Sequence, residues 1–520
     1  MGYFGRPSSA CALCRSRRIK CDLSRPSCGQ CERVSRVCSG YRSRTDLVFR
    51  DQTNDVVSKA QRANRPSRQV AAGIISKRSP AQVHYEHEKT QSDISKSFDA
   101  ADPVSMSLPL SLEHQAFCFF YSNYISRPSK KAVTVYESVP ALYLASPNDS
   151  ALLYVITALG LAGLSHHTET YGMETAAEVW YNKALHEVHR NLRDLALAKE
   201  DLTLLVVLLL GLYETNTCRT PRSMKSWLRH TRGATVLLEL RGETQLDTEF
   251  GRTLFAHSRA QIIAGCIQTR TPLPEIVIHL SQKCRDSNTN PLEDIVPLSF
   301  HFCYLRSKFP FIPVNDQSEP RTRAIIAQYS AVSHQMRDWH CSLPSGFAPA
   351  KIFSVKSSSS VLSEYYHVYD DAWTAGAVNN SSASYILVNE ALIVQLSFLR
   401  DHYAHDPTEF VQLNDKISKA RDIIIYQIEA VCASVPDLLQ SNMAVAGVGL
   451  LWALYVSAQI SPRTASVQDT TRRWITGRLE KIGAELGVCQ ATTLAGLLRE
   501  EVEVTQLLDD GVLEVENIDG

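Results

Sequence analysis

Six cysteines within the first forty residues form a repeated pattern that is typical of metal coordination. The spacing is C-x2-C-x6-C, followed after six residues by a second C-x2-C-x6-C, and the positions are Cys11, Cys14, Cys21, Cys28, Cys31 and Cys38. Each C-x2-C pair can direct two sulfurs at one metal across a tight turn. The x6 spacer fits about two helical turns and returns a third sulfur to that metal. Each half of the pattern therefore predicts three thiolate ligands.

The number of sulfurs indicates how many metals they hold. Structural zinc takes four ligands in a closed tetrahedral site. Two separate sites with three sulfurs each would both lack one ligand, whereas two ions that share two of the six sulfurs both reach four. The sequence therefore predicts a binuclear cluster with two Zn²⁺ ions.

A basic run lies inside the first half of this pattern. Between the second and third cysteines the chain carries four cations and no acid, namely Arg15, Arg17, Arg18 and Lys20. Residues 1–80 contain 17 Lys and Arg against 5 Asp and Glu, and the remaining residues carry the opposite excess. A solvated charged tail would show the same surplus, but its position on and beside a metal module favours double-stranded DNA as the partner.

The segment from Cys11 to Cys38 resembles the fungal zinc binuclear cluster DNA-binding domain, and Pro26 in the loop between the halves matches that pattern too. The resemblance implies that the first and fourth cysteines, here Cys11 and Cys28, bridge the two metals. It also implies recognition of CGG-type triplets.

The resemblance extends to the way in which the module meets DNA. A short helix from Cys14 to Lys20 is expected to enter the major groove. The family's base-reading pair precedes the third cysteine, here at Arg17 and Arg18, and arginine can donate two hydrogen bonds to guanine O6 and N7. Lys20 and Arg15 are expected to hold phosphates. The second half of the pattern carries fewer cations and is expected to complete the metal sites.

Other cysteine chemistries explain less of the pattern. A single-zinc ribbon would leave two cysteines without a role, because it would use only Cys11, Cys14, Cys28 and Cys31. A disulfide framework needs an oxidising compartment, and the N-terminus lacks the apolar region of a signal peptide. Iron–sulfur spacings differ. The other eight cysteines, such as Cys118, Cys266 and Cys432, are expected to be buried reduced thiols.

Composition divides the chain into four segments. The zinc module occupies 1–45, and a basic to polar linker that is expected to be largely disordered occupies 46–108. An all-α body follows at 109–499, and 500–520 form a tail with eight acids and no Lys or Arg. In the linker, apolar residues at 49, 56, 63 and 70 make only one seam of a heptad and Pro66 interrupts it. No coiled coil is evident, so dimerisation stays open.

Apolar periodicity predicts that the body is helical. Two stripes step by three and four residues, the first at Ala177, Tyr181, Ala184, Val188, Leu192 and Leu195, and the second at Leu413, Ile417, Ala420, Ile424, Ile428 and Val431. Leu202–Tyr213 and Met443–Ile460 are almost wholly apolar. Their length and flanking residues favour buried core helices over membrane spans.

A second motif in the body also carries a resemblance. The pattern W-x2-H-x2-G-A-x2-L-L-x2-R-G runs from Trp227 to Gly242. It is similar to the helical regulatory region found downstream of many fungal zinc clusters. Its spacing predicts a helix with Trp227, Ala234, Leu237 and Leu238 facing inward, ended by the glycine.

These features together predict a nuclear, sequence-specific transcription regulator of RNA polymerase II genes. No nucleophile elbow, zincin motif or Walker loop occurs, so an enzyme is not expected. The tail is expected either to recruit coactivators or other transcription machinery, or to form an amphipathic C-terminal helix. A regulator of metabolism or secondary metabolism is the leading interpretation. Its alternatives are a ligand-gated or xenobiotic-responsive regulator whose body binds a small-molecule effector, and a repressor.

Overall fold

The computed structural model describes two stretches of the chain. The first is 10–38 without 12, 15–16, 18, 25–26 and 35–37. The second is 111–502 without 126–133, 148–149, 169–171, 286–289, 310–318, 354–359, 442 and 462–465. The expected linker at 46–108 and nearly all of the acidic tail lie outside the described residues, so the disorder and activation assigned to them stay predictions.

The first stretch is small and contains little regular structure. A helical turn at Leu13–Cys14 and the four-residue helix α2 (Gly29–Glu32) lie in its two halves. Each element carries the second cysteine of its C-x2-C pair, and the first cysteine lies three residues earlier, just before the helical residues. The two sulfurs of each pair are thus about one helical turn apart along the chain.

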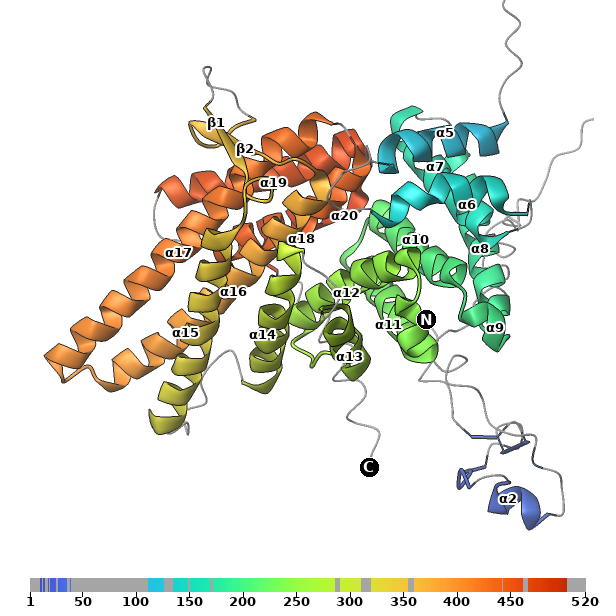
Figure 1. Ribbon diagram of the computed structural model, residues 1–520, viewed down its shortest axis with the longest axis horizontal. Coiled ribbons are helices and arrows are strands. Elements are labelled where there is room, and N and C mark those ends of the chain that lie inside the picture. The colour runs from blue at the N-terminus through green and yellow to red at the C-terminus, as the bar shows by residue number, and fades with distance from the viewer. Residues whose placement is uncertain are drawn as a thin grey trace, which may run out of the picture. The chain divides into compact units, whose positions relative to one another are not determined.

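The N-terminal part of the body is built from helices that follow one another closely (Figure 1). They are α5 (Leu112–Tyr124), η1 (Val135–Ser138), α6 (Val139–Ala145), α7 (Ala151–Thr168), α8 (Met173–Asn191), α9 (Leu195–Ala198), α10 (Asp201–Thr217), η2 (Pro221–Ser223), α11 (Met224–Arg241), η3 (Gly242–Leu246), α12 (Glu249–Thr269) and α13 (Glu275–Arg285). Helix α7 packs against α5, α8 and α10, and α11 packs against α10 and α12.

The C-terminal part contains the longest helices and one small sheet. Its elements are η4 (Pro291–Ile295), α14 (Val296–Lys308), α15 (Glu319–Ser342), β1 (Ala350–Phe353), β2 (Tyr365–Val368), α16 (Ala372–His402), α17 (Pro407–Gln440), α18 (Ala444–Ile460), α19 (Ser466–Leu486) and α20 (Cys489–Glu500). Helices α15, α16 and α17 lie side by side (Figure 1). Strands β1 and β2 pair antiparallel, with Ala350 opposite Val368, and β2 packs on α17.

Helix α20, the last helix of the described chain, packs against helices of the N-terminal part of the body. Helix α20 packs on α18 and also on α10. The Thr493 hydroxyl donates to the carbonyl of Cys218, 2.8 Å away. His166 of α7 lies 2.8 Å from the carbonyl oxygen of Ala484 in α19 through its Nε2. Residues more than two hundred positions apart therefore share one apolar core.

The predicted core helices form and are buried. Helix α10 buries nearly every residue from 203 to 213, and α18 buries most of its length. Helices that are apolar on all sides are expected at the centre of a large core. Two other helices, α7 and α16, are long and apolar enough to cross a membrane by length and composition, yet most of each is buried within the body.

The prediction of buried apolar stripes holds fully for the second stripe and only in part for the first. All six positions of the second stripe are buried along α17, so that prediction is confirmed. In the first stripe Ala177, Ala184 and Val188 are buried in α8, but Leu195 is 61% exposed. Helix α8 ends at Asn191, and the Asp194 carboxylate caps a new short helix, α9. The predicted stripe therefore ran past the end of α8. Beyond that end the 3.6-residue period no longer tells which side chains face the core, and this is why Leu195 is exposed.

The W-x2-H motif forms helix α11, as predicted. Ala234, Leu237 and Leu238 are buried and Trp227 is half-buried. The helix ends at Arg241, and Gly242 follows with φ +60°, a conformation that favours glycine.

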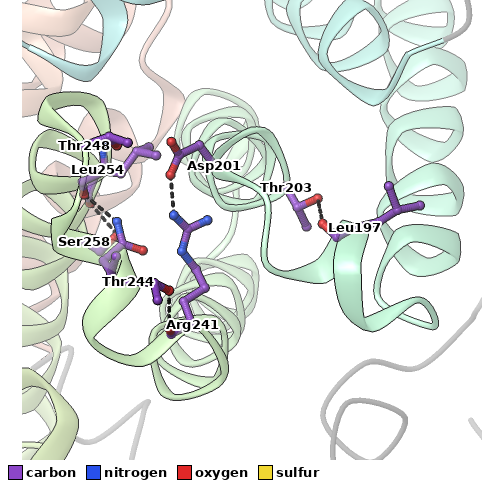
Figure 2. A network of polar contacts seen from close by, with 10 residues as sticks. Leu197, Asp201, Thr203, Arg241, Thr244, Thr248, Leu254 and Ser258 are labelled. Carbon is purple, nitrogen blue, oxygen red and sulfur yellow. Dashed lines mark hydrogen bonds and ion pairs between the residues drawn. The ribbon is translucent and has the colours of Figure 1, made fainter.

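A partly buried ion pair connects the end of this motif helix to its neighbour. Figure 2 shows the Arg241 guanidinium directed at the carboxylate of Asp201, with which it forms an ion pair. Asp201 is the first residue of α10, so its negative charge also lies at the positive end of that helix dipole. Arg241 thus joins the C-terminal end of α11 to the N-terminal end of α10.

Candidate zinc centre and nucleic-acid interface

The six cysteine sulfurs gather into two groups of four. In the first group the Sγ atoms of Cys11, Cys14, Cys21 and Cys28 all lie within 4.8 Å of one another, and in the second those of Cys11, Cys28, Cys31 and Cys38 do. The two groups have Cys11 and Cys28 in common. Six sulfurs thereby make two complete tetrads.

The distances between sulfurs match zinc coordination. A tetrahedral ion with Zn–S bonds of about 2.3 Å separates its sulfurs by about 3.8 Å. The Cys11–Cys28, Cys11–Cys31 and Cys14–Cys28 pairs are each separated by 3.7 Å. A disulfide would bring two sulfurs to about 2.05 Å, and all six cysteines are free thiols. The site therefore fits two zinc ions, as the spacing predicted, and disulfides do not fit it.

The single-zinc ribbon is also a poorer fit to this geometry. That alternative gave no role to Cys21 and Cys38. Each of them supplies the fourth sulfur of one tetrad. Both are only partly buried, whereas the two shared sulfurs belong to residues with 0% exposure.

Burial makes the bare cluster electrostatically unfavourable. Burial raises the pKa of Cys14, and the hydrogen bond with Cys28 together with burial raises the pKa of Cys31 to about 12. Without a cation these thiols would keep their protons at neutral pH. Two Zn²⁺ ions would supply the positive charge that makes the thiolate form favourable and would release the protons on binding.

The sulfurs also provide most of the core of the first stretch. Its buried cluster consists of Cys11, Cys14, Cys28 and Cys31, against which Ala10 and Leu13 pack. So few apolar side chains cannot offset the conformational entropy of folding. The metal ions must therefore contribute to the stability of this module.

The residues expected to contact DNA are only partly described. Arg17 and Lys20 are exposed, whereas Arg15 and Arg18 lie outside the described residues. The amide of Arg17 donates to the carbonyl of Leu13 at 3.2 Å, which continues the first helical turn. Ile19 and Lys20 have left the helix, so it is shorter than the predicted range to Lys20. The chain must turn there because Cys21 has to reach the cluster.

One residue that the sequence analysis did not single out joins the two halves. The Asp22 carboxylate accepts hydrogen bonds from the amides of Gly29, at 2.9 Å, and Ser24, at 3.4 Å. Its position directly after the third cysteine was the available signal. Between these residues Leu23 adopts φ +60°, which is rare for a residue with a side chain.

The eight remaining cysteines do not all meet the expectation. Cys266 and Cys432 are buried, as predicted, and burial raises the pKa of both thiols. Cys118 is exposed on α5, so the prediction for it was wrong, and Cys341 is exposed on α15. In each case the cysteine lies on the face of its helix that does not pack on the core.

Both the zinc module and the N-terminal part of the helical body match models of known protein families. Residues 9–47 match the fungal Zn(2)-Cys(6) binuclear cluster domain, and 109–269 match the fungal specific transcription factor domain. No solved structure matches the chain.

Two curated proteins are similar to part of the chain. The aspercryptin biosynthesis cluster-specific transcription regulator atnN of Emericella nidulans is 39% identical over 56 residues, which are 11% of this chain and 9% of that protein. White-opaque regulator 2 of Candida albicans is 42% identical over 50 residues, which are 10% of this chain and 11% of that protein. The similarity thus spans about a tenth of each relative. The chain carries a fungal Zn(2)-Cys(6) binuclear cluster domain and a fungal specific transcription factor domain, and it resembles fungal transcription regulators.

Proposed function

We propose that this protein is a nuclear regulator of RNA polymerase II transcription that binds double-stranded DNA through its zinc cluster and reads CGG-type triplets. The observation that carries the proposal is the pair of four-sulfur groups that share Cys11 and Cys28. Together with the matched transcription factor domain, it makes a regulator without catalytic activity the best-supported function. Cys11 and Cys28 are then the bridging ligands.

The basic run supplies the proposed contacts with DNA. Arg17 and Arg18 would read base edges, because a guanidinium can donate two parallel hydrogen bonds to guanine. Arg15 and Lys20 would hold phosphates. Lys20 is exposed just beyond the helical turn, where a single ammonium is suited to the backbone of DNA.

Two substitutions in the full chain test this division. Arg18→Ala is expected to reduce the preference for a CGG-containing site over a scrambled one by about 1–3 kcal/mol. Lys20→Ala is expected to weaken both sites alike and to lower the slope of log affinity against log salt by about one. Binding titrations at several salt concentrations measure both effects. Identical profiles for the two variants would contradict the assignment, and absence of any preference in the natural protein would contradict sequence-specific binding.

The tail at 500–520 is proposed to contribute to activation. Acidic residues alternate there with Val and Leu, and coactivator grooves bind such segments through their apolar face. Fusion of the tail to a foreign DNA-binding domain is expected to drive a reporter gene. Removal of its apolar residues should reduce the signal more than removal of single acids. A silent fusion would favour the alternative of a C-terminal helix, or a repressor.

The biological role is proposed from the relatives. One relative is named as a regulator of a biosynthesis cluster, which supports control of metabolism or secondary metabolism here. Mapping of binding sites across the genome, combined with transcript profiles of a deletion strain, tests this role. If no binding site lay near a gene whose transcript changes in the deletion strain, the proposed regulatory role would be contradicted.

A further inference from the structure

Asp22 connects the two halves of the zinc module through its carboxylate. One oxygen accepts a hydrogen bond from the amide of Gly29, 2.9 Å away, across seven residues of chain. The other accepts a longer bond from the amide of Ser24, at 3.4 Å, which closes the local turn. Asp22 directly follows the basic run and the third cysteine, so this bond fixes the point at which that segment meets the second half.

The bond to Gly29 satisfies the start of α2. Gly29 is the first residue of that helix, and its preceding residue, Cys28, makes no side-chain hydrogen bond to it. The first amides of a helix have no partner within the helix and need one from outside. Asp22 supplies that partner, and it therefore sets the orientation of the helix that carries Cys31 and directly follows Cys28.

Two features of the backbone are adapted to this contact. A β-carbon at Gly29 would lie 2.7 Å from the nearer Asp22 oxygen, so a side chain there would displace the carboxylate from its present position. Leu23 adopts φ +60°, which costs a residue with a side chain roughly 1–2 kcal/mol. The module retains this backbone strain where the carboxylate bridges its two halves.

The negative charge of Asp22 is electrostatically unfavourable at this position of the module. Six thiolates and two Zn²⁺ ions leave a net charge of about −2, so a further carboxylate beside them is repelled by the cluster. It would also repel the phosphates of DNA. Its negative charge is therefore unfavourable beside the zinc-loaded cluster and beside DNA, and the hydrogen bonds that it accepts are the physical reason for its place there.

We propose that Asp22 is a positioning residue for DNA recognition: by holding α2 against the chain that follows Lys20, it sets the orientation in which the basic run is presented to the base edges. This inference rests on the proposed function. It predicts that loss of the hydrogen bonds reduces the discrimination between sequences even when both zinc ions are bound.

Four variants of the full chain test the inference. Asp22→Ala removes the acceptor and the charge. Asp22→Asn keeps one oxygen acceptor for the Gly29 amide and removes the charge together with the longer bond from Ser24. Glu32→Ala removes the same charge from an exposed position of α2. Gly29→Ala keeps the carboxylate and displaces it. For each, zinc is counted by native mass spectrometry, and affinities are measured on a CGG-containing and a scrambled site at saturating zinc.

The expected quantity is the ratio of the two affinities. Asp22→Ala and Gly29→Ala should lower it by about tenfold, within the range of one base contact. Asp22→Asn and Glu32→Ala should leave it unchanged and strengthen binding to both sites alike, because each removes one negative charge. If Asp22→Ala fails to bind two zinc ions, Gly29→Ala decides the question.

Three results separate the possible failures. An unchanged ratio in Gly29→Ala with two zinc ions bound would overturn the inference, because a purely stabilising contact loses its effect once the metal is saturating. An equal fall of the ratio in Glu32→Ala would also overturn it, because charge alone would then be the cause. A natural protein without any preference between the sites would instead contradict the proposed function.

Discussion

The zinc module and the helical body reach stability by opposite means. In the module, the buried side chains are mainly cysteines that surround two metal positions, and few apolar contacts support them. In the body, Leu, Ile, Val and Phe side chains from helices throughout the described range form one continuous core. The module therefore depends on a ligand, whereas the body depends on the shape of its own side chains.

The comparison also shows where charge is tolerated. In the module the negative sulfurs are concentrated at one point and require cations. In the body the buried charges lie apart from one another: Arg259 pairs with Glu293, 2.7 Å away, and Arg306 donates to the carbonyl of Ile267 at 2.8 Å. Each region should therefore respond to a different kind of perturbation, and the following predictions separate them.

The largest effect is expected from removal of zinc. Structural zinc contributes about 10–16 kcal/mol in small zinc-dependent domains. Cys28→Ser should abolish both sites, because this sulfur belongs to both tetrads, whereas Cys21→Ser should impair only one. Native mass spectrometry of the full chain counts the ions, with the exposed Cys118→Ser as control. A Cys28 variant that retains two zinc ions would contradict the sharing, and a loss of helical signal from the body would contradict the separation of the regions.

The next effect concerns the ion pair within the body. Arg259 is 7% exposed at its side chain and lies in the segment that matches the transcription factor domain, whereas Glu293 lies beyond it. Arg259→Met should lower the free energy of unfolding by about 3–5 kcal/mol, because it leaves a half-buried carboxylate without its partner.

Replacing both partners provides the control for this prediction. The double variant Arg259→Met, Glu293→Leu should recover most of the loss, since no unpaired charge remains. Denaturant titration followed by circular dichroism measures all variants, and the zinc content should stay at two. An equal loss in the single and double variants would show that packing, and not charge, connects these segments.

A cavity in the core should lower the free energy of unfolding by about as much as loss of the Arg259–Glu293 pair, or slightly less. Leu209 of α10 is fully buried, and Leu209→Ala should cost about 2–5 kcal/mol of unfolding free energy. Leu195→Ala, at the exposed position of α9, should cost much less. Thermal unfolding compares the two variants. Equal losses would indicate that Leu195 is covered in the protein in solution.

The smallest effect is a change in pH dependence. Burial lowers the pKa of His257 to about 4, where it lies beside Tyr136 and Gln261. Its unfolded value is about 6.5. Between these values the unfolded chain binds a proton that the folded body does not, so the stability of the body falls as the pH decreases from 6.5 towards 4.

Substitution of this histidine isolates its contribution. His257→Gln should reduce the slope of unfolding free energy against pH by one proton, or about 1.4 kcal/mol per pH unit, in that interval only. The exposed His405→Gln serves as control. Zinc must remain bound during the measurement, since protonation of thiolates would add its own acid sensitivity. An unchanged slope in the His257 variant would show that this site is hydrated in solution.

Much of this protein follows from its sequence because several signals are local. The spacing of six cysteines favoured two zinc ions, since two ions that share two sulfurs use all six, whereas a single ion would leave two of them without a role. The apolar segments of α10, α17 and α18 predicted buried helices, because a side chain's face on a helix follows from its position alone. The Arg-Gly end of α11 similarly predicted where that helix stops.

Only the tertiary structure decided the contacts between distant positions. The sequence shows Asp22 and Gly29 seven residues apart but not the bond between them, which depends on how the cluster folds the chain. It likewise shows Arg259 and Glu293 without their pairing, and Leu195 without its exposure. Periodicity describes one helix at a time. Which helix ends, which charge meets its partner and which surface is covered are decided by packing among segments that the local pattern does not connect.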